Sequence, residues 1–148
     1  MFLYLILFFL IFLKLFYHLY ILKMNNKVLV IGHSPSNPNI KFRSKAATIK
    51  RLDRWLDACG VDIYSFTNLC AHHSDSIKAA DIDETLIKEC VKPYNKVIAL
   101  GNEVAHYFKK KGIDCFHAPH PSPRNRKFND KSYESTVING LQKYIHMI

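Results

Sequence analysis

The chain has 148 residues and a formal net charge of +9, from 21 lysines and arginines against 12 aspartates and glutamates. This length fits one domain of modest size and excludes a multi-domain protein. A hydrophobic fraction of 49% with only five glycines and six prolines excludes a disordered, collagenous or low-complexity chain. The composition is uneven, because residues 1–22 are apolar except for Lys14 and His18.

The apolar segment 1–22 has two main interpretations. As a helix it spans about 33 Å, enough to cross a bilayer core of about 30 Å, although Lys14 would cost on the order of 3 kcal/mol there. Alternatively, translation begins at Met24, directly before a strand-like run. A secretory signal is disfavoured, because no positive charge precedes the run and no small-residue cleavage site follows it. We therefore divide the chain into a leader, residues 1–23, which is a mis-assigned start or a membrane anchor, and a domain, residues 24–148, expected to fold alone. Both interpretations place the domain in the cytoplasm.

The four cysteines form no C-x-x-C pair, which disfavours zinc-ribbon and redox motifs. In a reducing compartment we expect free thiols. These are Cys59, Cys70, Cys90 and Cys115. The best candidate metal ligands are Cys70, His72 and His73 with His117 or His120, but solvated histidines are the more common case. We expect no metal and no cofactor.

Hydrophobic periodicity predicts alternating strands and helices. Short apolar runs, typical of strands buried on both faces, cover 27–32, 61–67, 96–101 and 113–118. Stretches with helical spacing of apolar residues cover 44–59, 83–91, 102–111 and 131–146. Ser44 and Asn102 are candidate N-caps, and Gly60 and Gly112 stand where C-terminal glycines belong. This alternation predicts an α/β fold with a parallel sheet covered on both faces.

Ligands bind at the carboxyl ends of such strands, and three of the loops there carry suitable residues. Gly32 begins a proline-stiffened loop whose backbone N–H groups can hold a carbonyl or phosphate oxygen, with no Walker motif. Asn68 offers one acceptor and two donors, the set needed to read a pyrimidine edge. In the loop after residue 118, three prolines surround His120 and Ser122, and the cations Arg124, Arg126 and Lys127 follow. Such a loop can hold a histidine beside a polyanion.

These motifs resemble those of the uracil-DNA glycosylase superfamily over residues 27–146. The resemblance rests on four pieces: G-x-x-P at Gly32–Pro35, T-N-L at Thr67–Leu69, V-I-A-L-G-N-E-V-A at 97–105, and H-P-S-P at His120–Pro123. It implies a three-layer α/β/α sandwich on a four-stranded parallel sheet. It also implies excision of uracil or a related damaged base from DNA, by hydrolysis of the N-glycosidic bond after base flipping.

The resemblance assigns roles to particular residues. The loop Gly32–Pro35 would activate water and contact the uracil O2, with His33 and Ser34 as catalytic candidates. Asn68 would read the base, Phe42 would stack on it unless it is a core residue, and His120 would stabilise the leaving uracil anion. The residues expected to contact DNA are Ser122, Arg124, Arg126 and Lys127.

Two departures from the family pattern affect these expectations. Ser34 stands where the family usually has an aspartate, and a hydroxyl is no comparable base, although His33 can partly substitute. Arg124 replaces a leucine that wedges into the duplex, which favours stacking or phosphate contact. The N-terminal C-x-x-C of the iron-sulfur branch is missing.

Three functions therefore remain open. The leading prediction is a monomeric DNA glycosylase that acts on single- or double-stranded DNA. The alternatives are a catalytically weak member of the same fold that binds DNA or a protein, and a hydrolase of free nucleosides or nucleotides.

Overall fold

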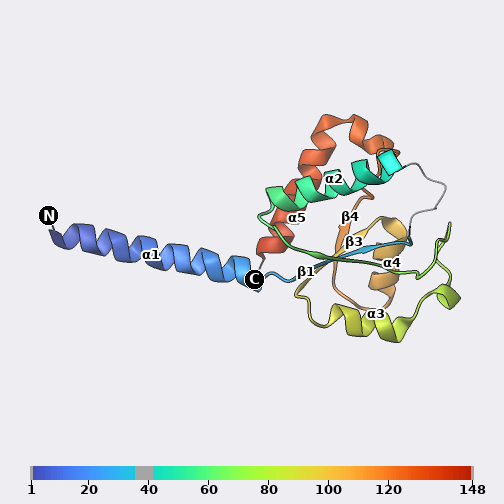
Figure 1. Ribbon diagram of the computed structural model, residues 1–148, viewed down its shortest axis with the longest axis horizontal. Coiled ribbons are helices and arrows are strands. Elements are labelled where there is room, and N and C mark those ends of the chain that lie inside the picture. The colour runs from blue at the N-terminus through green and yellow to red at the C-terminus, as the bar shows by residue number, and fades with distance from the viewer. Residues whose placement is uncertain (1, 36–41, 148) are drawn as a thin grey trace.

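The computed structural model describes residues 2–35 and 42–147. A parallel sheet lies between two layers of helices (Figure 1). Its strands are β1 (Val28–Gly32), β2 (Ser65–Asn68), β3 (Lys96–Leu100) and β4 (Phe116–Ala118). The α-helices are α1 (Phe2–Asn25), α2 (Phe42–Ala58), α3 (Glu84–Val91), α4 (Asn102–Lys110) and α5 (Lys131–His146). Two short 3-10 helices are η1 (Ala79–Asp81) and η2 (Arg126–Asn129).

The sheet order is β2-β1-β3-β4, and every neighbouring pair is parallel. The chain moves outward from β1 to β2 and then returns to add β3 and β4 on the other side. Between β1 and β3 the direction of winding therefore reverses, and sheets of this kind bind ligands at the carboxyl ends of the strands beside that point. The predicted four-stranded parallel α/β fold is confirmed.

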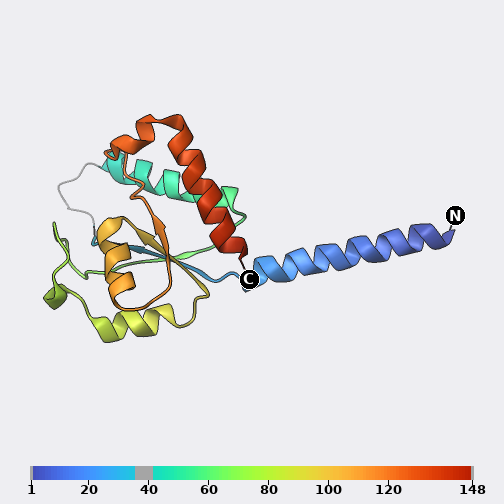
Figure 2. The same cartoon turned by 180° about the vertical axis from the view of Figure 1, so that it is seen from behind.

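Each face of the sheet has its own core, because successive side chains of a strand point to opposite faces. Val28 and Val30 pack with α2 and α5, where Trp55 is completely buried. Leu29 and Ile31 pack with α3 and α4. Figure 2 shows the two layers from behind, with α5 and α2 on one side of the sheet and α3 and α4 on the other.

Several boundaries differ from the sequence prediction. The second and fourth strands start later than expected, at Ser65 and Phe116. Before β4, the N–H of Ile113 still donates to the carbonyl of Phe108 at the end of α4, so the chain is not yet free to join the sheet. Before β2, the N–H of Val61 likewise donates to the carbonyl of Leu56 in α2, and pairing with β1 begins only at Ser65, opposite Leu29.

Both predicted N-caps are wrong. Ser44 lies inside α2, which begins at Phe42. Asn102 is the first residue of α4, and its N-cap position is taken by Gly101, whose φ of 90° allows a sharp turn out of β3. Gly60 and Gly112 do adopt positive φ after their helices, as expected.

Helix α1 extends away from the sheet and its helices (Figure 1). Its large apolar side chains between Ile6 and Tyr17 are at least 48% exposed. Among the residues that the structure describes, no helix is long and apolar enough to cross a membrane. The division of the chain at residue 23 stays a prediction.

All four cysteines are free thiols, as predicted. Cys59 and Cys70 are buried, and Cys90 and Cys115 are partly buried. Burial raises the pKa of Cys59 to about 11, so this thiol stays protonated and unreactive at neutral pH.

Candidate active site

A cavity of about 230 Å³ opens at the carboxyl ends of β1, β2 and β3. The strands supply its floor, and α2 and the loop after β4 supply its walls. Its lining residues are Gly32, His33, Ser34, Thr48, Ile49, Leu52, Phe66, Asn68, Leu100, His120, Pro121, Ser122 and Arg124. The fold thus brings together seven of the residues expected at the site, from three separate loops.

Gly32 and Asn68 are register partners at the ends of β1 and β2. A Cβ atom added to Gly32 would lie 2.7 Å from Oδ1 of Asn68 and 3.0 Å from the Phe66 ring. The Asn68 amide therefore lies directly over the Gly32 backbone, in space that only glycine leaves open. The carbonyl of Gly32 also accepts a hydrogen bond from the N–H of Leu69 at 2.8 Å, which ties the two loops together.

The His120 imidazole is oriented by its own loop. Its Nδ1 accepts a hydrogen bond from the backbone N–H of Ser122 at 3.2 Å, so in the neutral ring the proton is on Nε2. The carbonyl of His120 accepts from Nδ2 of Asn125 at 3.2 Å. Desolvation and, to a lesser extent, the proximity of His33 lower the pKa of His120 below its ordinary value of 6.5. At neutral pH His120 is therefore a neutral hydrogen-bond donor through Nε2.

His33 stands beside a carboxylate that the sequence prediction missed. Nε2 of His33 lies 3.6 Å from Oε2 of Glu103, the second residue of α4. This nitrogen is buried and has no hydrogen-bond partner among the described atoms. The backbone of His33 is fixed by a 2.9 Å hydrogen bond from the N–H of Cys70 to its carbonyl. The pair places a negative charge next to the cavity, where Ser34 supplies none.

Ser34 lines the cavity, but its hydroxyl is already engaged. Its Oγ donates to the carbonyl of Ser74 at 3.2 Å and accepts from the N–H of Ser74 at 3.3 Å. Both contacts anchor the loop after β1 to the segment after β2. We therefore interpret Ser34 as a residue that fixes the loop.

The remaining expected residues lie away from the cavity or outside the described residues. Pro35 does not line the cavity, and its carbonyl lies 3.1 Å from Nδ1 of His73. The side chain of Phe42 lies outside the described residues, so its predicted role in stacking is untested. Arg126 and Lys127 are exposed in η2 and do not line the cavity.

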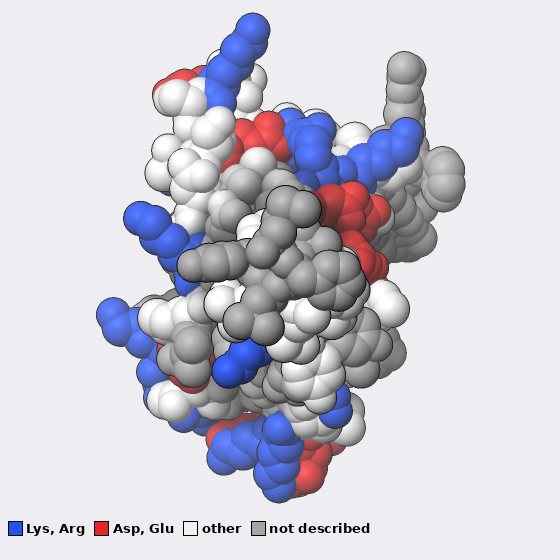
Figure 3. All heavy atoms as spheres, turned by 90° about the vertical axis from the view of Figure 1, so that its left-hand side faces the viewer, with Lys and Arg blue, Asp and Glu red and all other residues white. Residues whose placement is uncertain are grey.

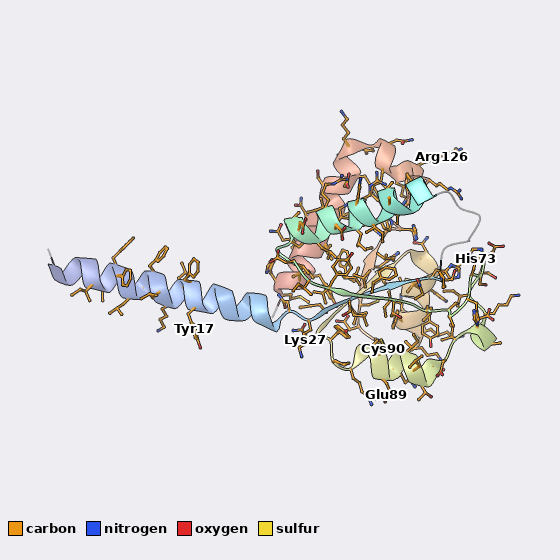
Figure 4. The ribbon with its side chains drawn as sticks, viewed as in Figure 1. Tyr17, Lys27, His73, Glu89, Cys90 and Arg126 are labelled. Atoms are coloured by element: carbon orange, nitrogen blue, oxygen red, sulfur yellow. The ribbon has the colours of Figure 1, made fainter. Side chains whose placement is uncertain are left out.

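The distribution of basic and acidic residues differs between the two ends of the sheet. Figure 4 places Arg126 and His73 at the end where the strands finish, and Lys27 at the opposite end. At that opposite end, Figure 3 shows patches of acidic side chains next to basic ones. At the cavity end, Arg124 lines the cavity, and Arg126 and Lys127 follow it along the chain in η2.

Sequence reasoning missed one aromatic residue of the site. Phe66, on β2, is 45% exposed and lines the cavity next to Gly32. Periodicity predicts Phe66 only as an apolar residue of the strand 61–67, and the structure does place it on β2. Its exposed ring became recognisable only with the sheet order, because β2 is an edge strand.

A larger cavity of about 660 Å³ runs along α4, between this helix and the segment 76–84. Glu103, which contacts His33, lines this larger cavity, and so do Glu84 and Lys111, which form an ion pair. No strand end contributes to its lining. We place the candidate active site in the smaller cavity, because the predicted residues converge there.

The comparisons with known proteins agree with the fold. No protein-family model and no curated protein sequence matches the chain. Among solved structures, it is similar to the NMR structure of a candidate uracil DNA glycosylase from Methanosarcina acetivorans, with a TM-score of 0.53. The match covers 82% of this chain and 91% of that one, at 18% sequence identity. The chain therefore has the three-layer α/β/α fold found in that protein.

Proposed function

We propose that the protein is a DNA glycosylase that hydrolyses the N-glycosidic bond of uracil, or of a related damaged base, in DNA. The observation that carries this proposal is the convergence of Asn68, His33 and His120 on one cavity at the carboxyl ends of the strands. DNA is the proposed partner because Arg124 lines this cavity, and Arg126 and Lys127, which follow it along the chain, are exposed and can contact phosphates.

Base recognition falls to Asn68 and Phe66. The amide of Asn68 can donate to a carbonyl of uracil and accept from its ring N–H. The Phe66 ring, beside Gly32, offers a face on which a flipped base can stack. A cavity of about 230 Å³ has room for a single flipped base.

His120 acts on the leaving group. When the bond between the sugar C1′ and the base nitrogen breaks, its electron pair moves to the base, and the negative charge spreads to the uracil O2. Nε2–H of neutral His120 donates to that oxygen, and because this donor is already oriented by Ser122, little reorganisation is needed.

His33 and Glu103 replace the missing aspartate. His33 accepts a proton from the attacking water as the water oxygen bonds to C1′, and the carboxylate of Glu103 stabilises the resulting imidazolium. The distance of 3.6 Å is long for a hydrogen bond, but contacts of this kind often shorten only when the substrate is bound.

The test is single-turnover excision on uracil-containing oligonucleotides with the full chain and His120→Ala. Comparable oxyanion donors are worth about 3 kcal/mol, so His120→Ala should slow the chemical step roughly 100-fold and leave DNA affinity nearly intact. Full activity of this variant would refute the mechanism.

The engaged hydroxyl of Ser34 favours one alternative, a catalytically weak member of the fold that binds DNA. Binding of uracil-containing DNA without excision by the wild-type chain would support that alternative. Hydrolysis of free nucleosides or nucleotides instead of oligonucleotides would indicate the third function considered from the sequence.

A further inference from the structure

Arg51, on α2, reaches the loop that carries His120. Its Nη1 donates to the carbonyl of Pro121 at 3.2 Å and to the carbonyl of Ser122 at 3.4 Å. These are the two residues that directly follow His120. The contact joins residues about 70 positions apart, so it links the helix layer to the cavity wall.

The guanidinium of Arg51 is held on its other sides. It lies over the ring of Phe128, 4.4 Å from the centroid. Its Nε lies 3.6 Å from Oε1 of Glu134, too far for a hydrogen bond, and this nitrogen has no hydrogen-bond partner among the described atoms. The direct hydrogen bonds of the group are thus directed at the loop, while Glu134 contributes charge.

Glu134, on α5, is itself fixed in place. It accepts a hydrogen bond from Nε1 of Trp55 at 2.8 Å and pairs with Arg54. Burial alone would raise the pKa of Glu134. The hydrogen bonds from Arg54 and Trp55, together with the charges of Arg54 and Arg51, outweigh burial, so this pKa lies below its ordinary value of 4.5. Glu134 therefore remains a carboxylate at neutral pH.

The same loop residue that Arg51 holds also orients the imidazole. The carbonyl of Ser122 accepts from Arg51, and the N–H of Ser122 donates to Nδ1 of His120. Any shift of Ser122 therefore moves the donor that fixes the ring. A charged donor to a backbone carbonyl is stronger than a neutral one, which suits it to hold such a loop.

We propose that Arg51 is a positioning residue, which acts through Ser122 to hold His120 against the leaving base. Arg51 does not belong to the cavity lining. The expected effect of Arg51 on the excision rate rests on the proposed function. The orientation of His120 through Ser122 does not depend on that function.

A double-mutant cycle on excision tests the proposal in the full chain. Misplacement of a catalytic group by about 1 Å lowers the reaction rate on the order of 100-fold. Arg51→Ala should therefore reduce the single-turnover rate by about 30- to 100-fold and change DNA affinity by less than about threefold. In the His120→Ala background, the same substitution should reduce the rate by less than about threefold. Equal reductions in both backgrounds would overturn the proposal.

Arg54→Ala is the matched control. Arg54 lies on the same helix and pairs with the same Glu134, but its side chain is 59% exposed and, within the described part of the chain, makes no hydrogen bond to the loop. Its substitution should leave the excision rate within about twofold of the wild type. A loss as large as that of Arg51→Ala would show that the charge pair with Glu134 matters, and the contact with the loop does not.

A second readout does not depend on activity. An NMR titration of the His120 imidazole in the full chain should show its pKa below 6.5 in the wild type and closer to 6.5 in Arg51→Ala, because a released loop exposes the ring to water. Besides desolvation, the group that lowers this pKa is His33, which is unchanged in the variant.

The two readouts separate the two claims. A wild-type chain that excises no base while Arg51→Ala still shifts the titration would refute the proposed function and support the positioning role. An unshifted titration would overturn the positioning role. Should Arg51→Ala fail to fold, Arg51→Lys takes its place in the same cycle, because lysine retains a charged donor. An intermediate loss of excision rate that occurs only in chains with His120 supports the proposal. An equal loss of rate in the His120→Ala background overturns it.

Discussion

Gly32→Ala should damage recognition of the base more than it damages the fold. The added Cβ would lie 2.7 Å from Oδ1 of Asn68, whereas ordinary contacts begin at 3.4 Å, so the amide must retreat by about 0.7 Å. The Phe66 ring, at 3.0 Å, must shift as well. The backbone itself accepts alanine, because Gly32 is not among the glycines with positive φ.

The magnitudes follow from these distances. Overpacking of this kind lowers the free energy of unfolding by about 1–3 kcal/mol. Alanine also reduces the freedom of the unfolded chain, which raises the free energy of unfolding by about 0.4–1 kcal/mol. We therefore expect a net loss of stability of about 0.5–2 kcal/mol, which lowers Tm by several degrees. A displacement approaching 1 Å at a substrate-positioning group costs up to about 100-fold in rate, so excision should fall about 10- to 100-fold.

The assay combines thermal unfolding with single-turnover excision of uracil. Gly140→Ala, on α5, is the matched control. Its added Cβ would meet the Phe116 ring at an ordinary contact distance of 3.4 Å, and Gly140 does not line the cavity. Helix propensity makes that variant up to about 1 kcal/mol more stable, with unchanged excision. Unchanged Tm and full excision in Gly32→Ala would refute the close packing of Gly32 and Asn68.

Three further predictions concern recognition, DNA contact and pH. Asn68→Asp places an acceptor opposite a uracil carbonyl, so uracil excision should collapse and any residual activity should move toward cytosine, as measured on matched oligonucleotides. Replacement of Arg124, Arg126 and Lys127 by alanine should reduce the slope of log affinity against log salt by about 2 to 3, and an unchanged slope would remove these residues from the DNA interface. The pKa of Glu134 is lowered in the fold, so its carboxylate stabilises the native state above pH 4.5 and this contribution is lost as the pH falls below that value. Urea unfolding between pH 3 and 7 should therefore show a shallower acid loss of stability in Glu134→Gln, and parallel curves would contradict the ion-pair network.

The sequence by itself determined the order of the elements and which loops meet at the candidate site. Runs such as V-L-V-I-G are too short for a helix and apolar enough for burial on both faces, so β1 was predictable to within one residue. The loops with Gly32, Asn68 and His120 were predictable as site loops because the carboxyl ends of parallel strands meet at one edge of the sheet.

Only the tertiary structure decided which groups support those loops. Glu103 stands beside His33, Arg51 holds the carbonyls after His120, and Ser34 is bonded to Ser74. Each contact joins residues about 40 to 70 positions apart on different layers or loops. Periodicity reports which face of an element is buried, but contacts between layers depend on how the helices cross the sheet, and a one-dimensional pattern does not contain that geometry.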